Sequence, residues 1–90
     1  MSNFIKAAQQ AELLIARERL AQVRKWGIQN HSHQDWMMIL MEEVGEFANA
    51  EMEHRYRNAP KERIKEELVQ VCSVARAMLE NLLRREAEGK

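Results

Sequence analysis

Apolar residues recur along this chain at the three- and four-residue spacing of amphipathic helices, and only two short stretches interrupt the pattern. One interruption is the polar stretch 27–34, which begins at Gly27, and the other is the stretch 58–60, which ends at Pro60. Glycine and proline are the strongest signals that a helix stops. The pattern therefore predicts three helices, from about Asn3 to Trp26, from Gln34 to Arg57, and from Pro60 to Glu86.

Signals at the ends of these segments support the bounds. Gly27 follows two cations, which suits a helix C-terminus, and Ser32 precedes Asp35 by three residues, as in a capping box. The first segment carries an apolar stripe at Leu13, Ala16, Leu20 and Val23. The third carries one at Ile64, Leu68, Val71, Ala75, Met78 or Leu79, and Leu82.

The second segment opens with six consecutive apolar residues, from Trp36 to Met41. A helix that is apolar on all sides is buried on all sides, and two further helices of a short chain cannot cover it completely. We therefore expect an all-α fold in which a three-helix protomer assembles into helical bundles, as a homodimer or homotetramer.

Length and composition narrow the class of protein. Ninety residues predict a single domain, residues 1–90, with a thin core. Fourteen basic residues balance fourteen acidic ones, which argues against a nucleic-acid partner, and no apolar run approaches the length of a membrane span. The single cysteine, Cys72, excludes an intramolecular disulfide and a cysteine-based zinc site. With no signal-peptide core at the start, we expect a cytoplasmic protein.

Acidic residues stand where the predicted core begins. Glu43 and Glu46 share a helix face, with Cβ atoms about 5–6 Å apart, and Glu67 lies in the third segment after a turn long enough to bring it back beside them. Clustered carboxylates repel unless a cation compensates them, and Mg²⁺ prefers such oxygen ligands and bridges them to phosphates. The pattern indicates metal-assisted phosphoryl transfer or hydrolysis; a solvated acidic face is the alternative interpretation.

The stretches KWGIQNHSHQDWMMILMEEVGEFANAEME and KEELVQVCSVARAMLENL resemble the MazG-like branch of the all-α nucleoside triphosphate pyrophosphohydrolases. The motif of that family is EExxE, followed roughly two dozen residues later by ExxD. Here EEVGE spans residues 42–46 and ELVQ spans residues 67–70, so that Gln70 stands in the place of the family's aspartate.

The resemblance implies hydrolysis of nucleoside triphosphates to the monophosphate and pyrophosphate, with Mg²⁺ as cofactor and Mn²⁺ as a substitute. It places the catalytic role on Glu42 and Glu43, with Glu42 as a further ligand or as the residue that orients or deprotonates the water. It also implies dimers or tetramers whose sites are lined by more than one chain. The implied metal ligands are Glu43, Glu46, Glu67 and Gln70.

Gln70 leaves alternatives open. An amide oxygen can bind Mg²⁺ but brings no charge, and Glu66 is a candidate to replace it. The alternative function is a catalytically attenuated module that binds nucleotide or metal, and a third is a purely structural oligomer.

Four residues around the polar stretch are candidates for substrate binding. Trp26 and Trp36 have aromatic faces suited to stacking on a base, although core packing is the commoner role of such residues. Gln29 offers amide donors and acceptors for base edges, and His31 is a candidate for contact with base or triphosphate.

Overall fold

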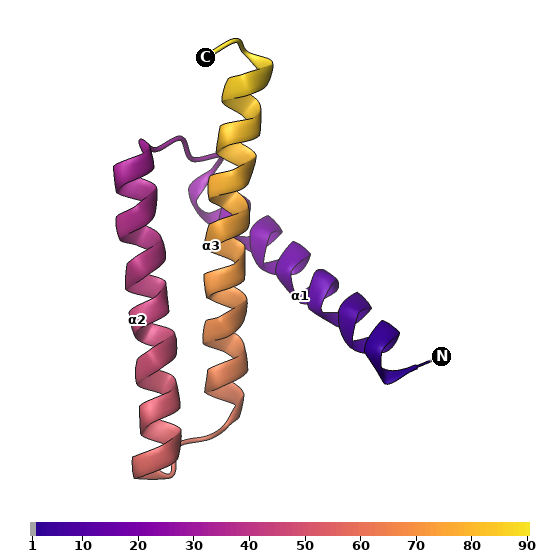
Figure 1. Cartoon of the computed structure of the whole chain (residues 1–90), viewed down its shortest axis with the longest axis vertical. Coiled ribbons are helices and arrows are strands. Elements are labelled where there is room, and N and C mark those ends of the chain that lie inside the picture. The colour runs from indigo at the N-terminus through magenta and orange to yellow at the C-terminus, as the bar shows by residue number, and fades with distance from the viewer. Residues whose placement is uncertain (1) are drawn as a thin grey trace.

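The computed structural model describes residues 2–90, and over that range its regular secondary structure is helical, without strands. Helix α1 spans Asn3–Trp26, α2 spans His33–Arg57 and α3 spans Glu62–Ala87. The all-α prediction and the order of the three helices are therefore confirmed (Figure 1). Within the described residues, no helix is both long and apolar enough to cross a membrane.

Local hydrogen bonds explain where the helices begin and end. Gly27 ends α1 with φ +74°, a backbone conformation that favours glycine, and its N–H donates to the carbonyl of Val23. The Ser32 hydroxyl accepts from the Asp35 N–H at 3.1 Å, so the predicted cap is confirmed, with α2 starting one residue earlier than expected. The third helix begins at Glu62, later than predicted. The turn after Pro60 first forms hydrogen bonds between residues three apart, from the Arg63 N–H to the Pro60 carbonyl and from the Ile64 N–H to the Lys61 carbonyl.

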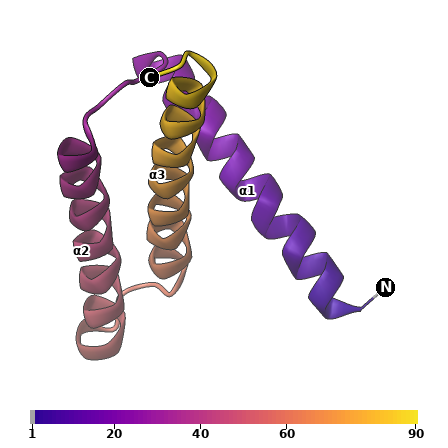
Figure 2. The ribbon, with the colours of Figure 1, turned by 45° about the horizontal axis from the view of Figure 1, so that its top comes forward.

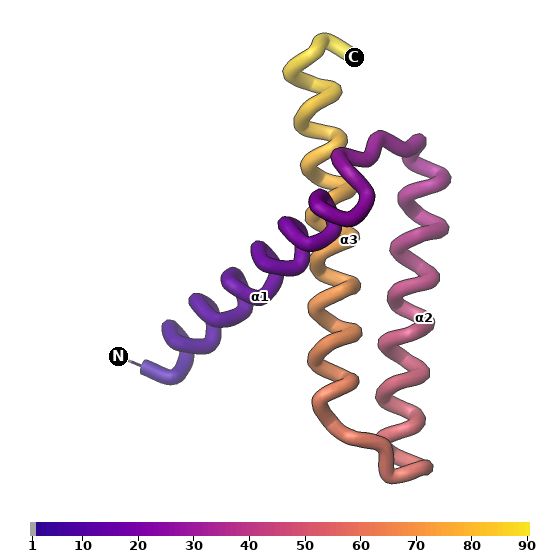
Figure 3. Tube along the Cα trace, turned by 180° about the vertical axis from the view of Figure 1, so that it is seen from behind, coloured from indigo at the N-terminus to yellow at the C-terminus, as the bar shows by residue number. Residues whose placement is uncertain are grey.

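The three helices do not form a closed bundle. Helices α2 and α3 run antiparallel, side by side (Figures 1, 2 and 3). Helix α1 packs on α3 alone, and the N-terminal end of α1 diverges from α3. The radius of gyration is 15.1 Å, against about 12 Å for a compact domain of 90 residues. The chain on its own is therefore extended rather than globular.

A small core lies between α2 and α3. Trp36, Val74 and Ala77 are buried together, and the half-buried residues packed against them are Ile39, Leu40 and Met78. Helix α3 also buries two polar residues, Ser73 and Asn81. The run Trp36–Met41 turns only part of its apolar surface into this core, and Met37, Met38 and Met41 stay exposed.

The predicted apolar stripe of α1 forms only part of its contact face, because Leu13 and Leu20 are exposed while Gln22 is buried. Most of the predicted stripe of α3 is half-buried, and its exceptions, Leu68 and Ala75, are exposed. Helix α1 meets α3 partly through the half-buried Leu14 and Ile15, which lie outside the predicted stripe, and partly through the ion pairs Arg19–Glu80 and Glu12–Arg76.

Candidate metal centre

Three carboxylates from the two helices of the α2–α3 hairpin converge, two of them half-buried. Glu43 and Glu46 lie one turn apart on α2, and Glu67 lies on α3. One oxygen of each lies within 4.8 Å of the others. The antiparallel pairing of α2 and α3 thus brings together the three acids that the sequence predicted to meet.

The cluster holds negative charge that no close cation neutralises fully. Burial raises the pKa of the Glu43 carboxyl, and the charges of Glu46 and Glu67 raise it further, followed by those of Glu42 and Glu18. Each cause disfavours the ionised form of Glu43. The site therefore favours binding of a proton or a cation.

One arginine stands at the edge of the cluster, but its stronger contact is elsewhere. Arg63 approaches Glu67 at 4.0 Å, a long ion pair, and bonds to Glu53 at 2.8 Å. Because Arg63 is held by Glu53, it compensates Glu67 weakly and leaves the oxygens of Glu43 and Glu46 without it.

A cavity of about 190 Å³ lies directly beside Glu43. Three of the four predicted substrate-binding residues line it, namely Trp26, Gln29 and Trp36. Gln70 lines it as well, one turn after Glu67 on α3. The remaining lining residues are Gln22, Ile39, Val74 and Ala77. The acidic cluster and a pocket with aromatic and amide walls are therefore neighbours.

The two tryptophans differ greatly in solvent exposure. Trp36 is 3% exposed and its indole Nε1 donates to Asn81 at 2.8 Å, so it forms a fixed wall. Trp26 is 56% exposed at the end of α1, with the Lys25 ammonium 4.7 Å from its ring centroid. Only Trp26 therefore has a ring that is largely open to solvent.

His31, the fourth predicted substrate-binding residue, does not line this cavity. Its backbone N–H donates to Asn81 at 3.0 Å, and its carbonyl accepts from Arg85. Its ring packs edge-on against Trp36, with centroids 4.7 Å apart. Its contacts anchor the loop between α1 and α2 to α3.

Glu42 and Glu66 lie outside the set of converging oxygens. Glu42 is exposed on α2, close enough for its charge to act on Glu43. Glu66, the candidate to replace Gln70, is exposed and lines a different groove, which it shares with Glu18 and Gln70. The geometry thus gives Glu66 no place among the three clustered acids.

Two residues of α1 reach the site and were not singled out from the sequence. Gln22 lines the cavity, and its amide bonds to Arg19 at 2.8 Å and to Glu18 at 3.3 Å. The i, i+4 spacing of Glu18 and Gln22 was a visible signal that they share a face. The sequence offered no means of telling that this face turns toward Glu43.

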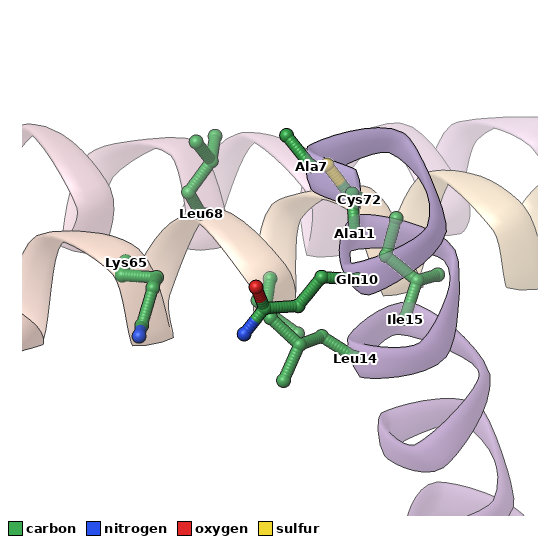
Figure 4. A pocket seen from close by; sticks show the side chains of 9 residues that line it. Ala7, Gln10, Ala11, Leu14, Ile15, Lys65, Leu68 and Cys72 are labelled. Atoms are coloured by element: carbon green, nitrogen blue, oxygen red, sulfur yellow. The ribbon is translucent and has the colours of Figure 1, made fainter. Parts of the chain in front are cut away.

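A second hollow, between α1 and α3, has no part in this site. It is an apolar crevice of about 310 Å³ that includes Cys72, and no predicted site residue lines it (Figure 4). Cys72 is half-buried among aliphatic side chains there, in accord with a packing role.

The donor set of the cluster fits a hard divalent cation. Carboxylate oxygens are the ligands that Mg²⁺ prefers, and two oxygens bound to one Mg²⁺ lie at most about 4.2 Å apart. The oxygens of the three carboxylates, within 4.8 Å of one another, lie close to this limit. Comparisons with known proteins add no assignment, since no family model, curated protein or solved structure matches the chain.

Proposed function

We propose that this protein is a Mg²⁺-dependent nucleoside triphosphate pyrophosphohydrolase, which releases the nucleoside monophosphate and pyrophosphate. The observation that supports this most is the convergence of Glu43, Glu46 and Glu67 beside a cavity walled by two tryptophans. A carboxylate cluster suits a cation that binds phosphates, and an aromatic cavity suits a base. The resemblance of residues 42–46 and 67–70 to the MazG-like motif points to the same function.

Each part of the site then has a role in the reaction. Glu43, Glu46 and Glu67 would hold the cation, which would supply charge neutralisation at phosphate oxygens and activation of a water molecule. Glu42, which is exposed beside them, offers a carboxylate oxygen that orients the attacking water and accepts its proton. Gln70 offers an uncharged amide at the cavity wall.

The nucleobase occupies the cavity in this proposal. Trp36 supplies a rigid wall, Trp26 supplies an exposed ring, and the Gln29 amide offers a donor and an acceptor to the base edge. We also propose a cytoplasmic location, where nucleoside triphosphates are supplied, and assembly as a homodimer or homotetramer.

Gln70 favours one alternative function, an attenuated module that binds nucleotide or metal without fast turnover. An aspartate at this position would add a fourth charged ligand, whereas the amide adds none. The cation is then held by fewer charges, and in this alternative the protein keeps nucleotide or metal binding while catalytic turnover is slow.

Pyrophosphate release from a panel of ribo- and deoxyribonucleoside triphosphates, with and without Mg²⁺, tests the proposal. We expect Mg²⁺-dependent release that Glu46→Gln and Glu67→Gln each lower by more than about 100-fold, beyond the usual effect of an outer-shell partner. The matched control is Glu51→Gln, because Glu51 is an exposed acid on the same helix outside the cluster. Absence of Mg²⁺-dependent release from every nucleotide contradicts the proposal.

Variants at Gln70 separate the enzyme from the attenuated module. Gln70→Asp restores a charge, so we expect tighter Mg²⁺ binding by calorimetry and equal or faster hydrolysis, while Gln70→Ala weakens both. If both the parent and Gln70→Asp bind Mg²⁺ and nucleotide without turnover, the binding module replaces the enzyme.

A further inference from the structure

The loop between α1 and α2, residues 27–32, passes beside the C-terminal half of α3 (Figure 1). Within the described chain, residues 28–31 form no backbone–backbone hydrogen bond, and residues 28–30 are exposed. Ile28 is 65% exposed, so the large apolar side chain of the loop does not anchor it. The conformation of the loop therefore depends on contacts from other parts of the chain.

Asn81 and Arg85 fix the end of the loop that precedes α2. The Asn81 amide accepts from the His31 N–H at 3.0 Å and donates to the Asn30 side-chain oxygen at 2.9 Å. The same Asn81 oxygen accepts from the indole of Trp36, which is a wall of the cavity. Arg85 donates to the His31 carbonyl. One buried residue of α3 thus holds both the loop and a wall of the cavity.

Arg84 holds the loop residue that lines the cavity. One nitrogen of its guanidinium, Nη2, donates to the Gln29 carbonyl at 3.0 Å and to the Asn30 side-chain oxygen at 3.1 Å. Gln29 lines the cavity beside Glu43, whereas Arg84 does not. Over residues 2–90 Arg84 forms no ion pair with a carboxylate, so its hydrogen bonds serve the loop.

We infer that Arg84 is a positioning residue that sets the base specificity of the site, because it holds the Gln29 amide at the edge of the bound base. The inference rests on the proposed function, since it takes the cavity as the place of the base. Arg84 acts through the backbone of Gln29 and contacts neither the base nor the carboxylates.

The position of Gln29 explains why such a residue is needed. An amide that pairs with a base edge discriminates between bases only while it is held to within about 0.5 Å. The loop begins at Gly27, with φ +74°, where the backbone has the greatest conformational freedom. Without Arg84 the Gln29 carbonyl loses its hydrogen bond, and the exposed loop no longer keeps the amide at the cavity.

Direct binding of phosphate is the competing role for an arginine near a nucleotide site. The geometry disfavours it, because Arg84 lies outside the cavity wall and its Nη2 already has two acceptors. The two roles also differ in their kinetic effect. Phosphate binding would strengthen the binding of every nucleoside triphosphate equally, whereas positioning of Gln29 favours the preferred base alone.

Steady-state kinetics on matched arginine variants test the inference. With the four common ribonucleoside triphosphates and Mg²⁺, we expect Arg84→Met to lower the ratio of kcat/KM between the best and the poorest substrate by about tenfold, the effect of one hydrogen bond. The loss should lie in the KM of the best substrate, with kcat changed by less than about twofold. The control is Arg76→Met, because Arg76 is also half-buried on α3 but pairs with Glu12 away from the cavity.

A double-mutant cycle tests whether Arg84 acts through Gln29. Gln29→Ala keeps the backbone carbonyl and removes the amide, so we expect it to lose the same discrimination. Adding Arg84→Met to Gln29→Ala should then change the ratio no further, because the two residues act as one unit. A further loss in the double variant, or an equal rise in KM for all four substrates, indicates direct phosphate binding and overturns the inference.

Amide hydrogen exchange tests the hold on the loop without any nucleotide. The His31 N–H is hydrogen-bonded to Asn81, so its exchange reports opening of the loop. We expect faster exchange by about tenfold in Arg84→Met, as for the loss of one hydrogen bond, and none in Arg76→Met. Exchange that is unchanged in Arg84→Met overturns the inference. Arg84→Lys, which keeps the charge and loses the planar guanidinium, is the second variant should Arg84→Met fail to fold, and an unchanged ratio and exchange there overturn the inference as well.

The parent protein distinguishes failure of this inference from failure of the proposed function. A parent that hydrolyses all four nucleotides with equal kcat/KM overturns the role of Arg84 in specificity and leaves the pyrophosphohydrolase standing. A parent that hydrolyses none contradicts the proposed function, and the specificity role falls with it.

Discussion

The α2–α3 hairpin carries two polar clusters that differ in how their groups are satisfied. Around Asn81, which is 1% exposed, every amide atom has a use: Oδ1 accepts from the His31 N–H and from Trp36, and Nδ2 donates to Asn30 at 2.9 Å. About four turns earlier on α3, Glu67 meets Glu43 and Glu46, and the three carboxylates repel one another. The Asn81 amide is fully paired within the chain, although the ring Nε2 of His31 beside it is buried without a partner, and the three carboxylates are not compensated.

Two carboxyls show the same contrast in their pKa values. A hydrogen bond from Arg19 lowers the pKa of Glu80, which stands beside Asn81 in the sequence, whereas burial and neighbouring acids raise the pKa of Glu43. A compensated carboxylate holds the fold together. An uncompensated one lowers stability.

The largest expected effect comes from removing the paired amide of Asn81 with Asn81→Leu. This change leaves the buried indole N–H of Trp36 and the His31 N–H without their acceptor. We expect a loss of about 3 kcal/mol in the free energy of unfolding and a fall in melting temperature of at least about 10 °C. Asn81→Asp keeps the acceptor oxygen and should lose less; equal losses from both variants contradict the role of the shared oxygen.

A smaller effect of opposite sign is expected from Glu43→Gln in the incomplete cluster. Because the folded-state pKa is raised above 4.5, ionising Glu43 costs stability as the pH rises above that value. Removing the charge at pH 7 should raise the free energy of unfolding without metal by about 0.5–1 kcal/mol.

The same variant should lose the stabilisation by Mg²⁺, because the cation binds only the folded cluster. Chemical denaturation with and without millimolar Mg²⁺ measures both effects, with Glu51→Gln as the control. A Mg²⁺ response that persists in Glu43→Gln places the cation elsewhere.

The smallest effect is expected from Glu80→Gln, which removes a compensated charge. The lowered pKa of Glu80 gives stability that is present above pH 4.5 and is lost as the pH falls through the folded-state value. With a side chain 37% exposed, solvent screening reduces the loss at pH 7 to about 0.5 kcal/mol.

The measurement is the free energy of unfolding of parent and variant between pH 3 and 7. The difference should vanish at the acidic end, and Glu86→Gln, at an exposed position of the same helix, should show none. A difference that does not depend on pH would mean that the Glu80 charge is not the source.

Local patterns predicted the elements well and the contact faces poorly. Gly27 and the Ser32–Asp35 pair gave the helix ends within a residue or two, because capping depends on neighbours in the chain. The apolar stripe at Leu13 and Leu20 did not predict how α1 packs, because α1 meets α3 through other apolar residues, Leu14 and Ile15, and through the ion pair Arg19–Glu80. Hydrophobic spacing cannot identify a contact made by charged side chains.

The sequence by itself determined that the chain is helical and that Glu43 and Glu46 share a helix face, and it predicted that a turn between antiparallel helices brings Glu67 beside them; the pairing of α2 with α3 decided that the three acids meet. Only the tertiary structure decided that α1 turns Glu18 and Gln22 toward the site, and that His31 anchors the loop outside the cavity. These outcomes depend on which side of α3 the first helix crosses and on the buried amide of Asn81, and both are contacts between residues far apart in the chain.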